Sequence, residues 1–160
     1  MENSKEVPWK FNGGREVVVP EWAIGFVYLI THRVGKKEVL YVGKKMLTTT
    51  RKQKIGKRTI AAERASRSDG KAHTVRKVVK SSGWESYWGS SKSLHLARES
   101  GEGTWQRTIV EWCHSKKHLS YSETKWQFMM KVLETESYND NIAGKWYRKN
   151  LIRPEKKGEV

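Results

Sequence analysis

The chain has a single cysteine among its 160 residues and no long apolar run. Cys113 alone makes no internal disulfide and no zinc finger or ribbon, which need pairs of cysteines, so a reducing compartment is favoured. The first fourteen residues lack the apolar stretch of a signal peptide, and no run approaches the ~20 residues of a membrane span. We therefore expect a cytoplasmic protein without a membrane partner.

Apolar residues are also scarce, at 36% of the chain. That fraction lies below the roughly 45–50% of an average globular protein, whereas the charged fraction of 31% lies above the usual ~25%. Eight Trp, six Tyr and three Phe argue against wholesale disorder, because disordered chains are poor in aromatic residues. The length suits one domain. The composition thus predicts one folded core with basic, flexible segments.

Acidic residues are nearly absent from one long stretch. Between Lys44 and Lys80 there are thirteen Lys and Arg residues and two acidic residues, a net charge of +11, whereas the rest of the chain carries +4. Lys and Arg that neutralise phosphates release condensed counterions, so this asymmetry indicates a polyanionic partner. Nucleic acid is the expected polyanion. Membrane-surface binding is disfavoured because the stretch has no strong apolar face.

Two apolar runs in the first third of the chain predict a β-hairpin. The runs GFVYLIT (25–31) and EVLYV (38–42) are rich in β-branched and aromatic residues, and a turn segment with Gly35 separates them. A third strand is expected at 105–113 and a short edge strand at 16–19. Such apolar runs favour strands that helices cover.

Helices are expected at 50–67, 74–81, 91–98 and 120–134. The last is the clearest, because Ser120 is a candidate N-cap and Glu123, three residues later, completes the pattern of a capping box. The segment between the first two helices reads as an exposed loop.

The hairpin carries a paired motif. Its strands contain Phe26-Val27-Tyr28 and Tyr41-Val42-Gly43, with Gly25 displaced by one position from the start of the first triplet. This pattern resembles the GIY-YIG nucleases, in which a Gly-hydrophobic-Tyr strand is followed by a Tyr-hydrophobic-Gly strand. The stretch Tyr87–Lys92 is similar to a Tyr-x-Gly-Ser segment of small phage and bacterial members.

The resemblance extends to residues downstream of the hairpin. It implies an arginine in the helix after the second triplet, where Arg51 stands, and a metal-binding glutamate early in the helix after the third strand, where Glu123 stands. It also implies an asparagine further on, for which Asn139 and Asn141 are both candidates. The resemblance covers roughly residues 25–144.

The resemblance implies a fold as well. We expect an α/β (α+β) protein with a small central antiparallel β-sheet of about three strands flanked by helices. An N-terminal strap (1–24) would precede the nuclease-like domain (25–148), which holds the basic insert at about 50–80. A basic flexible tail (149–160) would follow.

The chemistry of phosphodiester hydrolysis suits these residue types. The reaction needs a base for water and a cation for the phosphoryl oxygens. Glu123 is sufficient to hold one Mg²⁺, for which Mn²⁺ is a substitute, and Arg51 suits a bidentate clamp on the phosphate. The resemblance implies that Tyr28 is the base and that Tyr41 positions water or phosphate; the division between the two tyrosines stays open. A base must lose its proton, and we expect Mg²⁺, Arg51 and the neighbouring lysines to lower the pKa of Tyr28 from about 10.

Further cations are assigned to nucleic-acid binding. Lys44 and Lys45 follow Gly43 directly and are expected close to the phosphate, and Lys92 belongs to the Tyr-x-Gly-Ser segment. Lys54 and Arg58 stand three and seven residues after Arg51, so on a helix they would form a stripe along the DNA backbone.

The sequence therefore predicts a stand-alone, metal-dependent endonuclease of phage or bacterial type that acts on double-stranded DNA. One site cuts one strand, so a double-strand break needs a homo-oligomer or two successive nicks. The alternative is a non-catalytic basic DNA- or RNA-binding module with the same fold. In that alternative Glu123 caps its helix, the tyrosines are ordinary strand residues and Asn139 belongs to a turn.

Overall fold

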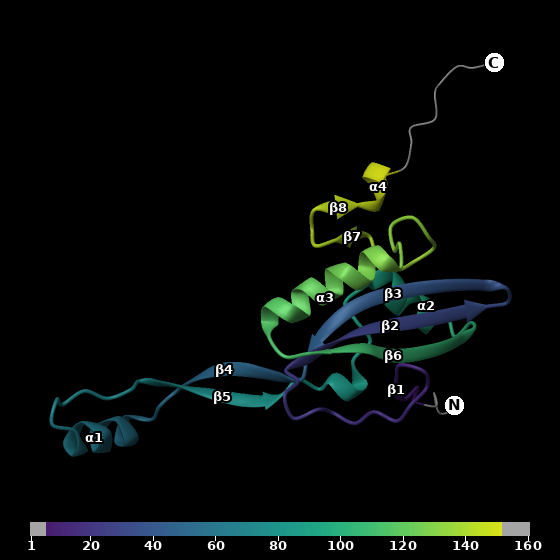
Figure 1. Cartoon of the computed structure of the whole chain (residues 1–160). Coiled ribbons are helices and arrows are strands. Elements are labelled where there is room, and N and C mark those ends of the chain that lie inside the picture. Colours follow the sequence, from purple (N-terminus) through teal and green to yellow (C-terminus); the bar gives the residue numbers. More distant parts are fainter. Residues whose placement is uncertain (1–5, 152–160) are drawn as a thin grey trace.

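The computed structural model describes residues 6–151, which form a four-stranded sheet with helices on both faces (Figure 1). The strand order is β1-β6-β2-β3. The strands are β1 (Trp9–Phe11), β6 (Thr104–Cys113), β2 (Gly25–Val34) and β3 (Lys37–Met46). All neighbours are antiparallel except β1, which runs parallel to β6. The three predicted central strands are confirmed, and the sheet has four strands because β1 joins it.

The predicted edge strand at 16–19 is wrong, because these residues have no strand structure. The edge position belongs instead to Trp9–Phe11, which pairs with Arg107–Ile109 of β6. Trp9 is 8% exposed and donates from Nε1 to the carbonyl of Trp84 at 3.1 Å. Burial of the indole thus places this short segment against the sheet, and Trp9 belongs to the core.

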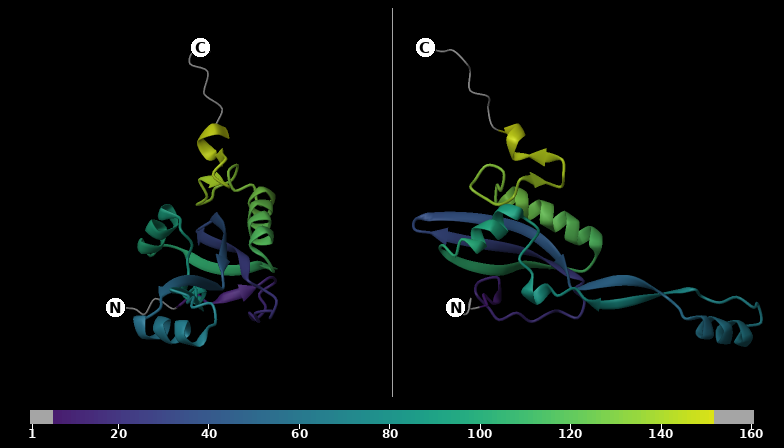
Figure 2. Two further views of the ribbon diagram at one scale, coloured as in Figure 1. Left: turned by 90° about the vertical axis from the view of Figure 1, so that its left-hand side faces the viewer. Right: turned by 180° about the vertical axis from the view of Figure 1, so that it is seen from behind.

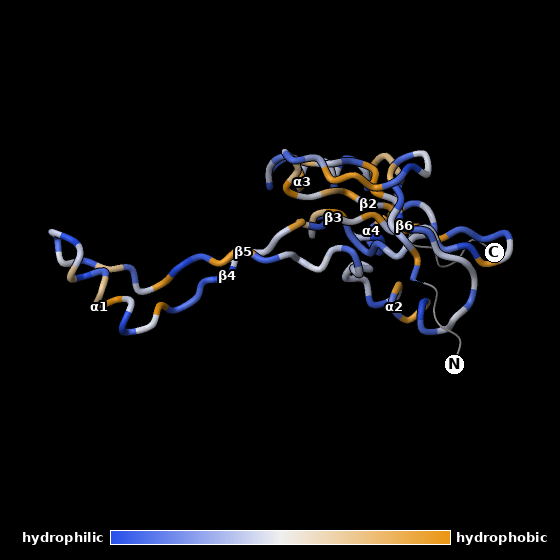
Figure 3. The backbone as a smooth tube through the Cα atoms, turned by 90° about the horizontal axis from the view of Figure 1, so that it is seen from below, coloured by the Kyte–Doolittle hydropathy of each residue, from blue (hydrophilic) through white to orange (hydrophobic). Residues whose placement is uncertain are grey.

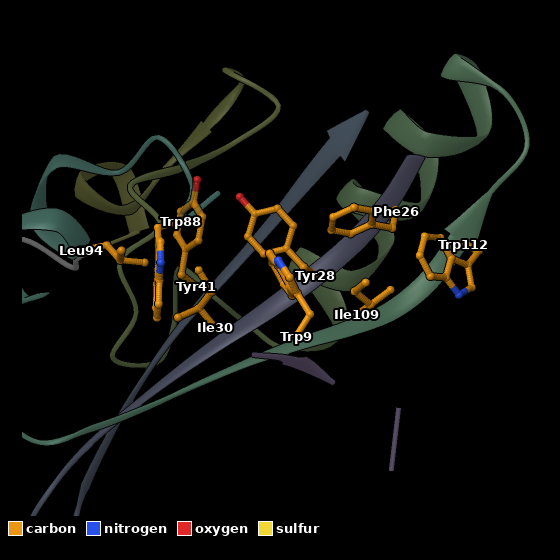
Figure 4. Close-up of a cluster of buried hydrophobic side chains, with 9 residues drawn as sticks. All are labelled: Trp9, Phe26, Tyr28, Ile30, Tyr41, Trp88, Leu94, Ile109 and Trp112. Carbon is orange, nitrogen blue, oxygen red and sulfur yellow. The ribbon is translucent and has the colours of Figure 1, made fainter. Parts of the chain in front are cut away.

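Strand β2 is buried on both faces, which explains its nearly continuous apolar sequence. Its Phe26, Tyr28 and Ile30 pack in an aromatic cluster (Figure 4) covered by η1 (Trp84–Ser86), α2 (Lys92–Glu99) and the N-terminal segment. Val27 packs on the opposite face, beneath α3 (Lys116–Met129). Figure 2 shows α2 and α3 on opposite sides of the sheet.

A basic arm separates β3 from η1 in the sequence. It consists of β4 (Thr48–Lys54), α1 (Lys57–Ser66) and β5 (Val75–Ser81), and it projects far from the body of the molecule (Figures 1 and 2). Strands β4 and β5 pair with each other only, in an antiparallel ribbon. Figure 3 shows that the arm is mostly hydrophilic, whereas apolar residues gather in the body.

Two helices predicted from the sequence differ from the structure of the arm. Residues 48–54 and 75–81 are strands, so the helix expected at 50–67 is confirmed only for its second half and the one at 74–81 is wrong. The Lys-, Arg- and Gln-rich composition is compatible with helix. Cross-strand pairing of the β-branched residues Thr48–Thr50 with Val79, Lys80 and Ser81 outweighs it.

Helix α3 begins five residues before the position expected from the capping box. Its N-cap is Ser115, whose side chain accepts a hydrogen bond from the backbone N–H of His118 at 3.0 Å. Ser120 and Glu123 therefore stand inside the helix, and the helix ends at Met129 rather than at 134. The earlier start buries Leu119, which is 2% exposed. The short helix at 91–98 is confirmed as α2, with Ser91 as N-cap.

The C-terminal segment holds two short strands, β7 (Asn141–Ile142) and β8 (Trp146–Tyr147), and α4 (Arg148–Leu151). Arg148 donates hydrogen bonds to the carbonyl oxygens of Thr135 and Asn139 at 2.7 and 3.0 Å, which ties this segment to the turn after α3. The first residues of the expected tail are thus helical, and its remainder lies outside the described residues. Within residues 6–151, no helix combines the length and apolar character needed to cross a bilayer.

Candidate active site

An open cavity of about 470 Å³ lies beside the outer edge of β3. Residues from four separate parts of the chain line it, among them Tyr41, Ser90, Lys92, Glu123, Gln127 and Asn139. The fold therefore brings together Tyr41, Lys92, Glu123 and Asn139, four of the residues singled out from the sequence.

Glu123 faces this cavity from the middle of α3. Its side chain is 22% exposed, and Oε2 lies 3.0 Å from Nζ of Lys44, which also donates to Oγ of Ser120 at 3.1 Å. Ser120, Glu123 and Gln127 share one helix face by their spacing, and Gln127 turns that face to β3 by donating to the Val42 carbonyl at 3.2 Å. Because Ser115 is the N-cap, the interpretation of Glu123 as a capping residue is wrong.

The two motif tyrosines project from β2 and β3 to the same face of the sheet, with their rings 6.1 Å apart between centroids (Figure 4). Gly43 pairs with Tyr28 across the hairpin, and a Cβ atom on Gly43 would collide with the Tyr28 hydroxyl. A Cβ atom on Gly89 would lie 2.6 Å from Cε1 of Tyr41. The glycine of the Tyr-x-Gly triplet is thus required by the close approach of the Tyr28 ring to the neighbouring strand.

The two tyrosines differ in their access to the cavity. Tyr28 is 1% exposed, whereas Tyr41 lines the cavity and its hydroxyl lies 3.4 Å from Oγ of Ser90. Burial raises the pKa of Tyr28 well above 10, and the nearby hydroxyls of Tyr41 and Tyr87 raise it further. Burial thus opposes ionisation of the Tyr28 hydroxyl. The expected lowering of its pKa depends on a bound Mg²⁺ and on cations that include Arg51, and Arg51 stands on β4 of the arm.

Tyr87 is a third tyrosine of this group, which the sequence reasoning missed as a site residue. Its ring centroid lies 6.1 Å from that of Tyr28, and Nζ of Lys45 lies 4.0 Å above the ring. Burial raises the pKa of Tyr87, as does the charge of nearby groups that include Glu123. The repeat of the Tyr-x-Gly pattern at Tyr87–Gly89 was the available signal.

Arg107 holds the segment that carries Tyr87. This residue on β6 is 1% exposed, lies between the rings of Trp9 and Trp88, and donates to the carbonyls of Tyr87 and Val7. Burial lowers its pKa to about 10. A buried cation with satisfied donors thus fixes the loop that leads from η1 into the cavity.

Asn139 supports the strand edge. It is 5% exposed, its Oδ1 accepts from the Val42 N–H at 2.9 Å, and its Nδ2 donates to the Val42 carbonyl at 2.9 Å. The amide thereby completes the hydrogen bonding of Val42, between Tyr41 and Gly43. Asn141 also lines the cavity, but its Oδ1 accepts from the N–H of Gly144 in a turn.

The predicted phosphate clamp lies elsewhere. Arg51 and Lys54 are exposed residues of β4, and Arg58 is an exposed residue of α1, so the helical stripe expected from their spacing is wrong. All three belong to the arm, and none of them lines the cavity. The cations near Glu123 are Lys44, which forms the ion pair, and Lys92, which begins α2 and lines the cavity.

The donor groups of the cavity fit one Mg²⁺. The partly exposed carboxylate of Glu123 lines the same cavity as Tyr41 and Ser90, whose side chains carry hydroxyls, and oxygen donors of this kind are what Mg²⁺ prefers. Within residues 6–151 no group of three or more His, Cys, Asp and Glu side chains gathers for a metal ion. A single carboxylate suits an ion that keeps several waters and takes its other ligands from a phosphate.

Comparison with known families agrees with this geometry. The family model described as "Putative endonuclease segE, GIY-YIG domain" matches residues 9–151. Searches of curated proteins and of solved structures gave no match. The matched span holds the hairpin with its two tyrosines, the basic arm, and the helix with Glu123. Because the match covers most of the chain, this protein belongs to the GIY-YIG endonuclease domain family.

Proposed function

We propose that this protein is a metal-dependent endonuclease that hydrolyses phosphodiester bonds of double-stranded DNA at the cavity beside β3. The main support for this proposal is that Tyr41, Lys92 and Glu123, from three separate elements, line one cavity in a chain of the GIY-YIG family. Families of this fold act as endonucleases, and the excess of +15 charges suits a polyanionic substrate.

In this proposal Glu123 would hold the Mg²⁺ ion through its carboxylate, with Mn²⁺ as a substitute. When bound, the ion supplies charge stabilisation at the phosphoryl oxygens. Lys44 lies 3.0 Å from the same carboxylate, so its ammonium group is available to a phosphate that enters beside Glu123. Lys92 takes the role of a phosphate-binding cation inside the cavity, which the sequence reasoning had given to Arg51.

The tyrosines have separate tasks. Of the two motif tyrosines, Tyr41 is the one that lines the cavity, so its hydroxyl contacts the attacking water or the scissile phosphate. Tyr28 stays neutral in its buried position and packs behind Tyr41, where its hydroxyl lies within reach of those of Tyr41 and Tyr87. Tyr28 therefore acts as a positioning residue.

The experiment compares cleavage of supercoiled plasmid by the wild-type protein, by Glu123→Gln and by the control Glu99→Gln, with Mg²⁺ and with EDTA. Glu99 is an exposed residue at the end of α2 and outside the cavity. We expect Glu123→Gln to lower the cleavage rate by at least about 100-fold, because it removes the anionic ligand, and Glu99→Gln to leave it unchanged.

Two results would contradict the proposal. Cleavage that persists in EDTA would mean that no divalent ion is needed, and full activity of Glu123→Gln would mean that the carboxylate is not part of the site. If plasmid is retarded on the gel under every condition and never cut, the protein is a non-catalytic binding module. The ratio of nicked to linear product reports whether one site or two act on a duplex.

A further inference from the structure

The arm has no hydrophobic core of its own. None of residues 48–81, all of which the structure describes, is buried. The segment carries eleven Lys and Arg residues against two acidic ones. Glu63 is hydrogen-bonded to His73 and Asp69 to Arg67, so both acidic residues are engaged within the arm. A two-stranded ribbon alone is only marginally stable in water. A polyanion bound along it would supply the missing interactions.

The register of the ribbon places Arg51, Gln53 and Arg76 on one face, which Lys80 and Val78 share, and Lys52, Lys54 and Lys77 on the other, which Val75 and Val79 share. Gln53 pairs with Arg76, and Arg51 is two residues away on the same face. We call these three residues the Arg/Gln face. Lys52 pairs with Lys77 on the opposite face, and Lys54 follows two residues later; these three form the lysine face. Side chains alternate between the faces of a strand, so the two sets point in opposite directions.

The Arg/Gln face holds the residue types that read base edges. An Arg side chain makes two hydrogen bonds to guanine, and Gln makes two to adenine, in the major groove. Nε and Nη2 of Arg76 donate to Oε1 of Gln53 at 3.2 and 3.1 Å, which fixes the two planar groups beside each other. These bonds use two of the five N–H donors of Arg76 and both lone pairs of Gln53 Oε1, so three donors of Arg76 and the amide N–H donors of Gln53 are free for a ligand. For the two-bond contact with adenine, Gln53 exchanges its bonds with Arg76 for bonds to the base.

The lysine face suits phosphates. Lysine is a point charge on a flexible stem and binds phosphate without a fixed geometry. Like charges directly opposite each other on a ribbon are destabilising, and Lys52 stands opposite Lys77. Phosphate groups near this pair would remove the repulsion.

We propose that the β4–β5 ribbon lies in the major groove of a DNA duplex, with Arg51, Gln53 and Arg76 on the base edges. This inference rests on the proposed function for its substrate and adds where sequence is read. The major groove, about 12 Å wide and 8.5 Å deep, admits a two-stranded ribbon. Because a sheet layer is about 10 Å thick, side chains of the outer, lysine face lie at the height of the flanking phosphates.

A basic surface joins the ribbon to the candidate active site. A second cavity, of about 550 Å³, lies at the root of the arm and is lined by Lys44, Lys45, Lys116 and residues 48–50. Lys44 also forms the ion pair with Glu123. One duplex can therefore contact the arm and the cavity of Glu123 together, with cleavage at a fixed offset from the sequence that is read.

The test uses two variants that lose the same charge. Arg51→Ala/Arg76→Ala removes two cations from the Arg/Gln face, and Lys52→Ala/Lys77→Ala removes two from the lysine face. Duplexes with a randomised segment are selected by binding in EDTA, and the preference for the selected sequence over random duplex is then measured for each protein. Thermal unfolding checks that the body stays folded.

We expect both variants to lose non-specific affinity alike, with the salt slope reduced by about 2. Of the two double variants, Arg51→Ala/Arg76→Ala alone should lose sequence preference, by about tenfold for each base pair contacted. Gln53→Ala, which changes no charge, should also lose preference.

The proposal is overturned if the wild-type protein has no preference, if the arginine variant retains it, or if the lysine variant loses it equally. Plasmid cleavage with Mg²⁺ is scored separately, so loss of the proposed nuclease function is distinguishable from loss of base reading.

Discussion

At the scale of single residues, the site depends on two glycines that leave room for aromatic rings. Gly43 lies against the Tyr28 hydroxyl, and Gly89, with φ of +84°, lies against the Tyr41 ring. Because the sheet, Trp9 and Phe26 enclose Tyr28, its ring has no free space into which it can move. The motif is thus a packing requirement, apart from any part that its tyrosines have in the proposed reaction.

Gly43→Ala is therefore expected to destabilise the protein by about 1–3 kcal/mol and to abolish most of the plasmid cleavage, since the added methyl group displaces the Tyr28 ring. Urea unfolding and the plasmid assay measure the two effects. Gly56→Ala is the control, because a Cβ atom there meets nothing within 4 Å and φ is −65°. Equal stability of the two variants would contradict this account of the Tyr-x-Gly triplet.

The residues of the site were predictable to different degrees. Tyr41 and Glu123, which the sequence singles out by their chemistry and order in the chain, line one cavity in the structure; their roles stay predictions. Arg51 was misplaced because the insertion of a whole arm after β3 moves it away, and composition does not separate a basic ribbon from a basic helix. Asn139 was found as a candidate, but its bonds to Val42 depend on a contact between residues 97 positions apart, which local sequence does not encode.

At the scale of elements, the sheet was the most predictable part of the fold. Apolar and β-branched runs predict strands β2, β3 and β6. Strand β1 has only three residues and depends on tertiary burial of Trp9. The start of α3 was wrong because two serines, Ser115 and Ser120, both offer an N-cap. Burial of Leu119 decided between them, and this is a property of the folded core.

The arm and the body are separable elements. Thr48 and Ser81 are paired at the root of the ribbon, so a two-residue Asn-Gly turn between Leu47 and Ser82 closes the chain without strain. We expect this deletion to change the melting temperature of the body little, because none of the removed residues, 48–81, is buried. Thermal unfolding followed by circular dichroism measures the melting temperature of the shortened chain. Unfolding of the shortened chain would mean that the arm contributes to the core.

At the scale of the whole molecule, positive charge is concentrated at one end. The arm carries eleven of the 32 Lys and Arg residues, and Lys44 and Lys45 continue the series to the second cavity, at the root of the arm. A protein that neutralises six or more phosphates loses about 1,000-fold or more in affinity between 50 and 200 mM salt.

We expect duplex binding by the full chain to show this steep salt dependence, and the arm deletion to show a much shallower one, in titrations with EDTA present. The comparison isolates the electrostatic contribution of the arm, since the body is common to both proteins. Parallel slopes for the two proteins would mean that the phosphates contact the body alone.

The bonds of Asn139 to Val42 have one more consequence for the molecule. An exposed strand edge with free N–H and C=O groups is a template on which another chain can add a strand and begin to aggregate. At β3 the Asn139 amide occupies both groups of Val42, and the backbones of Glu136 and Tyr138 bond to Leu40. At Leu40 and Val42 the edge of β3 therefore has no free backbone group on which a second copy of the chain could add a strand.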